Sequence, residues 1–183
     1  MYILGMSLRN KYAKEVVPAL KKQFGWKNDL QVPKITHIVV NAGIGKVRDQ
    51  EAVVKAIFSD LRKITGQQPV FTLAKQAIAG FKTKQGDRVG IKVTLRGGKM
   101  WDFFERLTVA ALPRVKDFGG IAEQNFSSAG DCSVGIREHT VFPEINPDET
   151  NHVFGLQIAI VTTAKKREEG VALMKALGFP VES

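Results

Sequence analysis

One segment of the chain alternates strictly between apolar and polar residues. From Arg88 to Arg96 every odd-numbered position is apolar, and the even-numbered positions between the two arginines hold glycine, lysine and threonine. Successive side chains of a strand point to opposite faces, so this pattern predicts a strand with one apolar and one cationic face. The apolar face must be buried against other hydrophobic elements, which leaves the cationic face free for a ligand.

The same region carries an excess of positive charge. Between Thr72 and Lys99 the chain has seven basic residues and one acidic residue, within a protein of net charge +9. A solvated face normally carries charges of both signs, so this excess of positive charge favours contact with the phosphates of a polyanion. We infer that the polyanion is RNA. The seven basic residues are Lys75, Lys82, Lys84, Arg88, Lys92, Arg96 and Lys99.

Composition limits the possible classes of protein. A length of 183 residues with 44% hydrophobic residues predicts one domain, 1–183, in which residues 1–6 form a short N-terminal extension. Cys132 is the sole cysteine, so no internal disulfide can form. No apolar run approaches the roughly 20 residues of a membrane span, and no signal peptide is recognisable. We therefore expect a cytoplasmic protein with no membrane partner.

Periodicity predicts alternating helices and strands. Helices are expected over 7–26, which Pro18 should divide, and over 50–65, 97–113 and 167–177. Strands are expected over 34–41, 70–73, 88–96, 133–140 and 152–163. The expected fold is α+β, with a mostly antiparallel sheet, helices packed on one face and the other face open for RNA.

Motifs of enzyme chemistry are missing from the sequence. His37, His139 and His152 are scattered and have no metal-ligand spacing with Cys132. The segments G-I-G-K and G-G-K lack the first glycine of a phosphate-binding loop, and N-A-G-I-G lacks the third glycine of a dinucleotide site. We expect no catalysis, no cofactor and no metal.

Three residues remain ambiguous from the pattern alone. Asn41 ends the first predicted strand, and capping of the following turn is favoured over contact with base edges. Gln67 is interpreted as a solvated loop residue. Phe81 lies between glycine and lysine in a polar loop, where stacking on a base and packing in the core are about equally supported.

Several motifs in one order resemble the large-subunit ribosomal protein L5 family, which binds 5S ribosomal RNA. They run across nearly the whole chain, from about residue 12 to residue 180. The matching segments are V-P-K-I-T-H-I-V-V-N-A-G-I-G, K-I-T-G-Q-Q-P-V, A-I-A-G-F-K, I-K-V-T-L-R-G, A-L-P-R-V-K-D-F, V-F-P-E-I and I-V-T-T-A-K.

The resemblance implies a structural role and a set of partners. It implies contact with 5S rRNA and neighbouring 23S rRNA in the central protuberance, with P-site tRNA through the loop over 73–84, and with a head protein of the small subunit. The residues implied to bind 5S rRNA are Asn41, Gln67, Phe81 and Thr94, with Lys92 and Arg96 beside Thr94. Those implied to contact tRNA are Lys75, Gln76, Lys82 and Lys84.

Two rival functions are compatible with parts of the same pattern. A free RNA chaperone would use the same cationic face without a ribosomal partner. A nucleotide-dependent enzyme would use the N-A-G-I-G turn. The acidic segment over 144–149 is a candidate contact for a basic small-subunit protein, and an ordinary solvated loop is an equal alternative.

Overall fold

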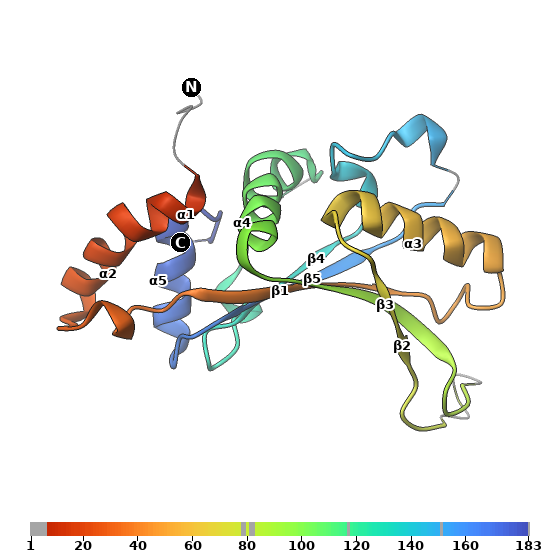
Figure 1. Cartoon of the computed structure of the whole chain (residues 1–183), viewed down its shortest axis with the longest axis horizontal. Coiled ribbons are helices and arrows are strands. Elements are labelled where there is room, and N and C mark those ends of the chain that lie inside the picture. The colour runs from red at the N-terminus through yellow and green to blue at the C-terminus, as the bar shows by residue number, and fades with distance from the viewer. Residues whose placement is uncertain (1–6, 78–79, 81–82, 117, 151, 183) are drawn as a thin grey trace.

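A five-stranded antiparallel sheet of order β2-β3-β1-β5-β4 organises the chain in this computed structural model (Figure 1). The structure describes residues 7–77, 80, 83–116, 118–150 and 152–182. The strands are β1 (Ile35–Gly43), β2 (Val70–Leu73), β3 (Arg88–Leu95), β4 (Cys132–Ile136) and β5 (Leu156–Thr162).

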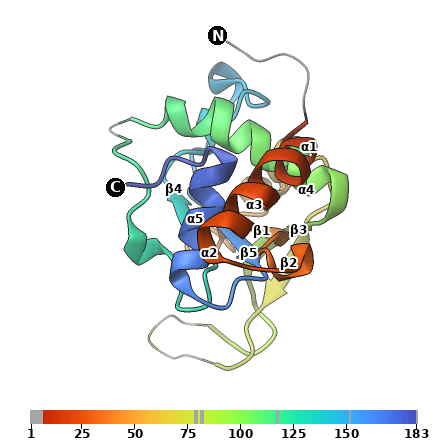
Figure 2. The ribbon, with the colours of Figure 1, turned by 90° about the vertical axis from the view of Figure 1, so that its left-hand side faces the viewer.

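The main helices lie to one side of the sheet and at one of its ends. Helices α3 and α4 stand over one face, and α1, α2 and α5 gather at the far end of β1 (Figures 1 and 2). Their bounds are α1 (Leu8–Lys11), α2 (Val17–Phe24), α3 (Glu51–Thr65), α4 (Gly97–Arg106) and α5 (Arg167–Leu177). The predicted α+β fold with an open antiparallel sheet is confirmed.

The alternating segment forms β3 with the predicted faces. Ile91, Val93 and Leu95 are buried, whereas Lys92 and Arg88 are exposed. The neighbouring β1 buries Ile38, Val40 and Ala42 on the same side, and Phe103 and Phe104 of α4 are fully buried. The core therefore lies between the sheet and its helices, and the cationic side of β3 faces away from it.

The pattern fails at the start of β1. Strict alternation from Ile38 predicts that Ile35 shares a face with Val39 and Asn41, yet Ile35 is buried. The pairing of β1 with β5 shifts register between Ile35 and His37. Such a bulge inserts an extra residue and reverses the parity of the side chains before it, so Ile35 joins the core.

The N-terminal helix remains helical from residue 8 to residue 24, but its hydrogen-bonding pattern changes just before Pro18. A π-helical segment, Tyr12–Val16, separates α1 from α2, and Pro18 lies in the first turn of α2. Proline lacks the amide hydrogen that a helix interior requires, and the first turn is where that loss is tolerated. A second π-helical segment, Leu107–Ala111, likewise follows α4 and precedes Pro113.

Two predicted strands are shorter in the structure. β4 ends at Ile136 rather than at residue 140, because His139 begins a 3-10 turn and is fully buried. β5 begins at Leu156 rather than at residue 152. The Phe154 amide donates to His139 Nδ1 at 3.4 Å, and the two rings stack with centroids 3.9 Å apart. These contacts bind the segment over 137–154 to the body of the protein.

A carboxylate of α3 lies beside the buried histidine. Asp60 Oδ2 is 3.5 Å from His139 Nε2. Burial lowers the pKa of His139, and the neighbouring Asp60 opposes that shift without cancelling it. In the unfolded chain the imidazole titrates near its ordinary pKa of about 6.5. Below that pH the unfolded chain binds the proton more readily than the folded one, so folding stability decreases as the pH decreases.

The buried histidine predicts a pH-dependent step in stability. The free energy of unfolding should fall as the pH decreases below about 6.5, by at most about 1.4 kcal/mol per pH unit from this group. His139→Phe keeps a stackable ring but cannot titrate, so urea unfolding between pH 5 and 8 should show a shallower slope. His152→Gln changes an exposed histidine and should keep the wild-type slope. Equal slopes for His139→Phe and wild type would contradict the assignment.

Candidate RNA interface

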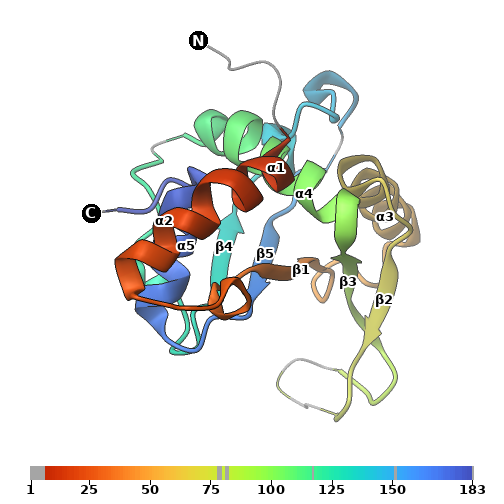
Figure 3. The same cartoon turned by 60° about the vertical axis from the view of Figure 1, so that its left-hand side comes forward.

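One row of residues crosses all five strands on the face opposite the helices. Strand register aligns Lys92 of β3 with Asn41 of β1 and Asn41 with Gln157 of β5. The row continues to Val70 at one edge and to Gly135 at the other. Residues directly paired in a ladder share a face. We call this side, which is free of helices in the described part of the chain, the open face (Figure 3).

A second row brings Thr94 onto the open face. Thr94 pairs with Val39, Val39 with Ala159, and Ala159 with Ser133. Thr94 is therefore two positions along β3 from Lys92, on the same side. The structure brings together Asn41, Lys92 and Thr94, three of the residues that the sequence singled out.

Small residues flatten the β4 and β5 side of the open face. Gly135 and Ser133 are exposed on β4, and Ala159 stands between them and β1. A shallow hollow of about 520 Å³ lies there, lined by Asn41, Gln157 and Arg137 among others. Small side chains allow a ligand to approach the backbone closely. This half of the open face can therefore accommodate a ligand whose own surface is extended and irregular.

Asn41 belongs to the face rather than to the turn after the strand. It is half-buried within β1, and the structure gives its amide no hydrogen-bond partner among the described residues. A Cβ built at Gly90 would lie 3.4 Å from Asn41 Oδ1 and 2.6 Å from Thr72 Oγ1. Glycine at position 90 thus leaves room for the Thr72 hydroxyl beside Asn41. Because Asn41 lies within β1 and not at its end, the turn-capping interpretation is not supported.

Gln67 is fixed against the end of β3. Its Nε2 donates to the Thr94 carbonyl at 3.0 Å. Gly66 ends α3 in the left-handed conformation with φ of 65°, which turns the chain toward β3. Lys99 Nζ donates to the Gly66 carbonyl at 3.2 Å. Gln67 is therefore a positioned residue beside Thr94 rather than a freely solvated one.

Positive charge is concentrated around β3. Lys92 is exposed in mid-strand, and Arg96 is exposed immediately before α4. Arg88 has another contact, because its guanidinium carbon lies 4.5 Å from the centroid of the Phe71 ring. The β4 and β5 side carries Gln157, Ser133 and Gly135 in its rows. The exposed cations of the open face are thus Lys92 and Arg96 around β3, with Arg137 at the hollow beside β4 and β5.

The residues predicted to contact tRNA are separate from these. Lys75 and Gln76 are exposed just after β2, and Lys84 is exposed on the returning segment. We call residues 74–87 the β2–β3 arm; its described residues, 74–77, 80 and 83–87, project beyond the sheet, away from α3 and α4 (Figure 1). Backbone hydrogen bonding from the Ala74 amide to the Asp87 carbonyl, at 2.8 Å, closes its base. Phe81 and Lys82, also predicted site residues, lie outside the described residues.

Sequence reasoning missed the contribution of β4 and β5. Gln157 completes the central row, and Gly135 and Ser133 flatten the face, yet none was singled out from the pattern. The polar position between Leu156 and Ile158 gave a signal for Gln157. Its placement beside Asn41 depends on strand order and register, which alternation within one strand does not supply.

The arrangement defines a class of protein. A flat sheet face that combines exposed cations with amides, hydroxyls and glycines is suited to binding RNA. Within the described ranges no helix is long and apolar enough to span a membrane. The geometry of the open face is that of an RNA-binding protein.

Comparisons with known proteins agree with this class. A model of the C-terminal part of the ribosomal L5 family matches residues 88–181, and one described as Ribosomal protein L5 matches residues 28–84. Large ribosomal subunit protein uL5 of Herpetosiphon aurantiacus is 49% identical over 173 residues, covering 94% of this chain and 97% of that protein. The protein of the same name from Microcystis aeruginosa is 47% identical over 177 residues, covering 97% and 99%.

The chain belongs to the ribosomal protein L5 family. This family is structural and non-enzymatic, so the prediction that the chain is not an enzyme is confirmed and the nucleotide-dependent alternative is wrong. Membership also confirms the prediction of a ribosomal protein that binds RNA and takes part in translation. It further confirms that the protein is associated with the ribosome in the bacterial cytoplasm.

Proposed function

We propose that this protein binds 5S rRNA in the large ribosomal subunit through its open face. The observation that carries the proposal is the row that aligns Lys92, Asn41 and Gln157 across three adjacent strands. It supplies a cation and two amides along one line, which matches a ligand with both phosphates and exposed base edges. The family is expected to bind 5S rRNA, and we therefore propose 5S rRNA as that ligand.

The cations and the neutral polar residues of the open face perform different parts of the recognition. Lys92 and Arg96 neutralise phosphates and set the register of the RNA. The Thr94 hydroxyl and the Asn41 and Gln67 amides contact sugars or bases of an irregular loop. Phe81 is proposed to stack on a base, worth ~1–3 kcal/mol. Neighbouring 23S rRNA completes the RNA surroundings of the protein.

The β2–β3 arm is proposed to reach the P-site tRNA. Lys75, Gln76, Lys82 and Lys84 are the contacts proposed there. The exposure of Lys75, Gln76 and Lys84, and the projection of the arm beyond the sheet, support this assignment (Figure 1). The arm and the open face would then serve two different RNA molecules.

The segment over 144–149 is proposed to contact a basic head protein of the small subunit. Glu144 is already engaged, because its Oε1 lies 2.7 Å from Arg106 Nε. Asp148 is exposed, and its backbone amide donates to Asn146 Oδ1 at 3.2 Å at the start of a 3-10 turn. Asp148 is therefore the better candidate for an intersubunit ion pair than Glu144.

The electrostatic and hydrogen-bonding parts of 5S recognition can be separated by mutation. Lys92→Ala should weaken 5S rRNA binding and reduce the slope of log K against log salt by about 0.7–0.9. Thr94→Val keeps a β-branched shape and removes the hydroxyl, so it should cost about 1 kcal/mol without changing that slope. Filter binding or fluorescence anisotropy over a salt series measures both quantities.

The matched control for these variants is Lys55→Ala. Lys55 is exposed on α3, away from the open face, and pairs with Glu51 at 3.1 Å. Its removal subtracts the same charge and should leave 5S affinity almost unchanged. Equal losses for Lys92→Ala and Lys55→Ala would mean that net charge, rather than the open face, determines binding.

Removal of the arm cation should leave 5S binding intact. Lys75→Ala should retain wild-type affinity for 5S rRNA, because Lys75 does not lie on the open face, but weaken tRNA protection in assembled subunits. Chemical footprinting of P-site tRNA on ribosomes that carry the variant measures this. A loss of 5S affinity with an unchanged tRNA footprint would refute the division between arm and face.

A further inference from the structure

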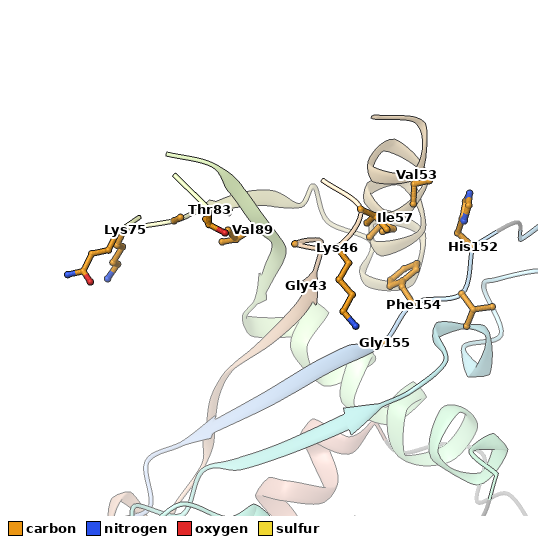
Figure 4. Close-up of a pocket in the computed structure, with 15 residues that line it drawn as sticks. Gly43, Lys46, Val53, Ile57, Lys75, Thr83, Val89, His152, Phe154 and Gly155 are labelled. Carbon is orange, nitrogen blue, oxygen red and sulfur yellow. The ribbon is translucent and has the colours of Figure 1, made fainter. Parts of the chain in front are cut away.

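A second cavity lies beneath α3, at the end of the sheet where the β2–β3 arm begins (Figure 4). Its volume is about 1190 Å³, larger than the hollow on the open face. Four elements form its walls: the turn after β1, the inner side of α3, the base of the arm and the segment over 152–155. None of the described residues proposed for 5S binding lines it.

The floor of the cavity is apolar. Val53 and Ile57 of α3 and Val89 of β3 contribute aliphatic side chains, and Phe154 contributes an aromatic ring. Figure 4 shows the Phe154 ring beside Ile57. Its stacking on buried His139, with centroids 3.9 Å apart, holds it in place. A planar apolar group can pack here without disturbing the ring.

The rim of the cavity is cationic. Lys46 comes from the turn after β1 and Lys75 from the opposite wall on the arm (Figure 4). No described residue that lines the cavity has a carboxylate. Asp87, at the base of the arm, is paired with Arg48 at 3.2 Å and accepts the Lys84 amide at 2.8 Å. The cavity therefore suits a ligand that joins planar apolar groups to negative charges.

The cavity adjoins the hollow on the open face. Gly43 and Gly155 line both the cavity and the hollow beside Asn41 and Gln157. A Cβ built at Gly43 would meet nothing within 4 Å, whereas one built at Gly155 would lie 3.3 Å from the Ile136 carbonyl oxygen. The cavity and the hollow therefore share this end of the sheet.

We propose that this cavity receives unpaired nucleobases of a single-stranded RNA segment, with the flanking phosphates held by Lys46 and Lys75. Bases splayed from a loop are commonly recognised by stacking and apolar contact, with cations along the backbone. An acidic peptide would share the charge but not the planar groups that match the floor. The choice of RNA over peptide rests on the proposed function, because Lys75 and Gln76 line the cavity and belong to the arm that is proposed to reach an RNA.

Gly45 offers a way to fill the cavity without straining the fold. It lines the cavity, and its backbone φ angle is not positive, so a side chain is not strained there. A Cβ built at this position meets nothing within 4 Å. Gly45→Trp therefore places a large ring in the space that a base would occupy. Leu30→Trp is the matched control, because Leu30 is 88% exposed after α2, at the opposite end of the molecule.

The experiment titrates the full-length protein with a fluorescently labelled hexa-adenylate oligoribonucleotide. We expect saturable binding, with amide resonance shifts at Val47, Lys75 and Phe154. Gly45→Trp should weaken the affinity about tenfold or more, the scale of the loss of one or two stacked bases, and Leu30→Trp should not weaken it. Equal thermal unfolding of the two variants would confirm that both are folded.

Three results would overturn the proposal. They are equal affinities for Gly45→Trp and Leu30→Trp, resonance shifts confined to the open face around Asn41 and Lys92, and saturable binding of an acidic peptide without binding of hexa-adenylate.

Measurement of 5S rRNA affinity for Lys92→Ala in parallel keeps the two proposals separate. If Lys92→Ala loses affinity for 5S rRNA and Gly45→Trp keeps its affinity for hexa-adenylate, only the cavity proposal is refuted. If Lys92→Ala keeps its affinity for 5S rRNA and Gly45→Trp loses affinity for hexa-adenylate, only the open-face proposal is refuted.

Discussion

The burial of one side of β3 and β1 beneath α3 and α4 is the constraint on which the rest of the molecule depends. Ile38, Val40, Ile91 and Leu95 are all inaccessible to solvent, and each such side chain contributes roughly 1.5–3 kcal/mol when it leaves water. Because side chains alternate along a strand, a slip of one residue would expose this set and bury Lys92 and Asn41. The same burial that stabilises the fold therefore orients the proposed RNA-binding residues outward.

The part of the fold that depends on local periodicity could be predicted from the sequence. The faces of β3 follow from its alternation, and the helix over 167–177 follows from its apolar spacing and its stop at Gly178. Features that depend on tertiary contacts could not be predicted. The bulge that buries Ile35 depends on pairing with β5, and the end of β4 depends on the contact of His139 with Phe154.

The same division applies to the candidate interface. Lys92 and Thr94 were predictable because they lie two positions apart on one strand. The placement of Gln157 beside Asn41 required the order of the strands, and the opening beneath α3 required the path of several separate segments. Charge excess marked the region as a whole, but it did not separate Lys92 on the sheet from Lys75 on the arm or Arg88 on an aromatic ring. Those roles are set by where each side chain lies in the fold.

The central claim is that RNA lies against the open face and not against the helices. Its most direct test is photocrosslinking from p-benzoylphenylalanine placed at Ser133, on the open face, and separately at Lys55, on the exposed side of α3. Both positions are exposed, so the probe perturbs the core at neither. In the complex with 5S rRNA, we expect crosslinks from position 133 and none from position 55. Crosslinks from position 55 alone would contradict the claim.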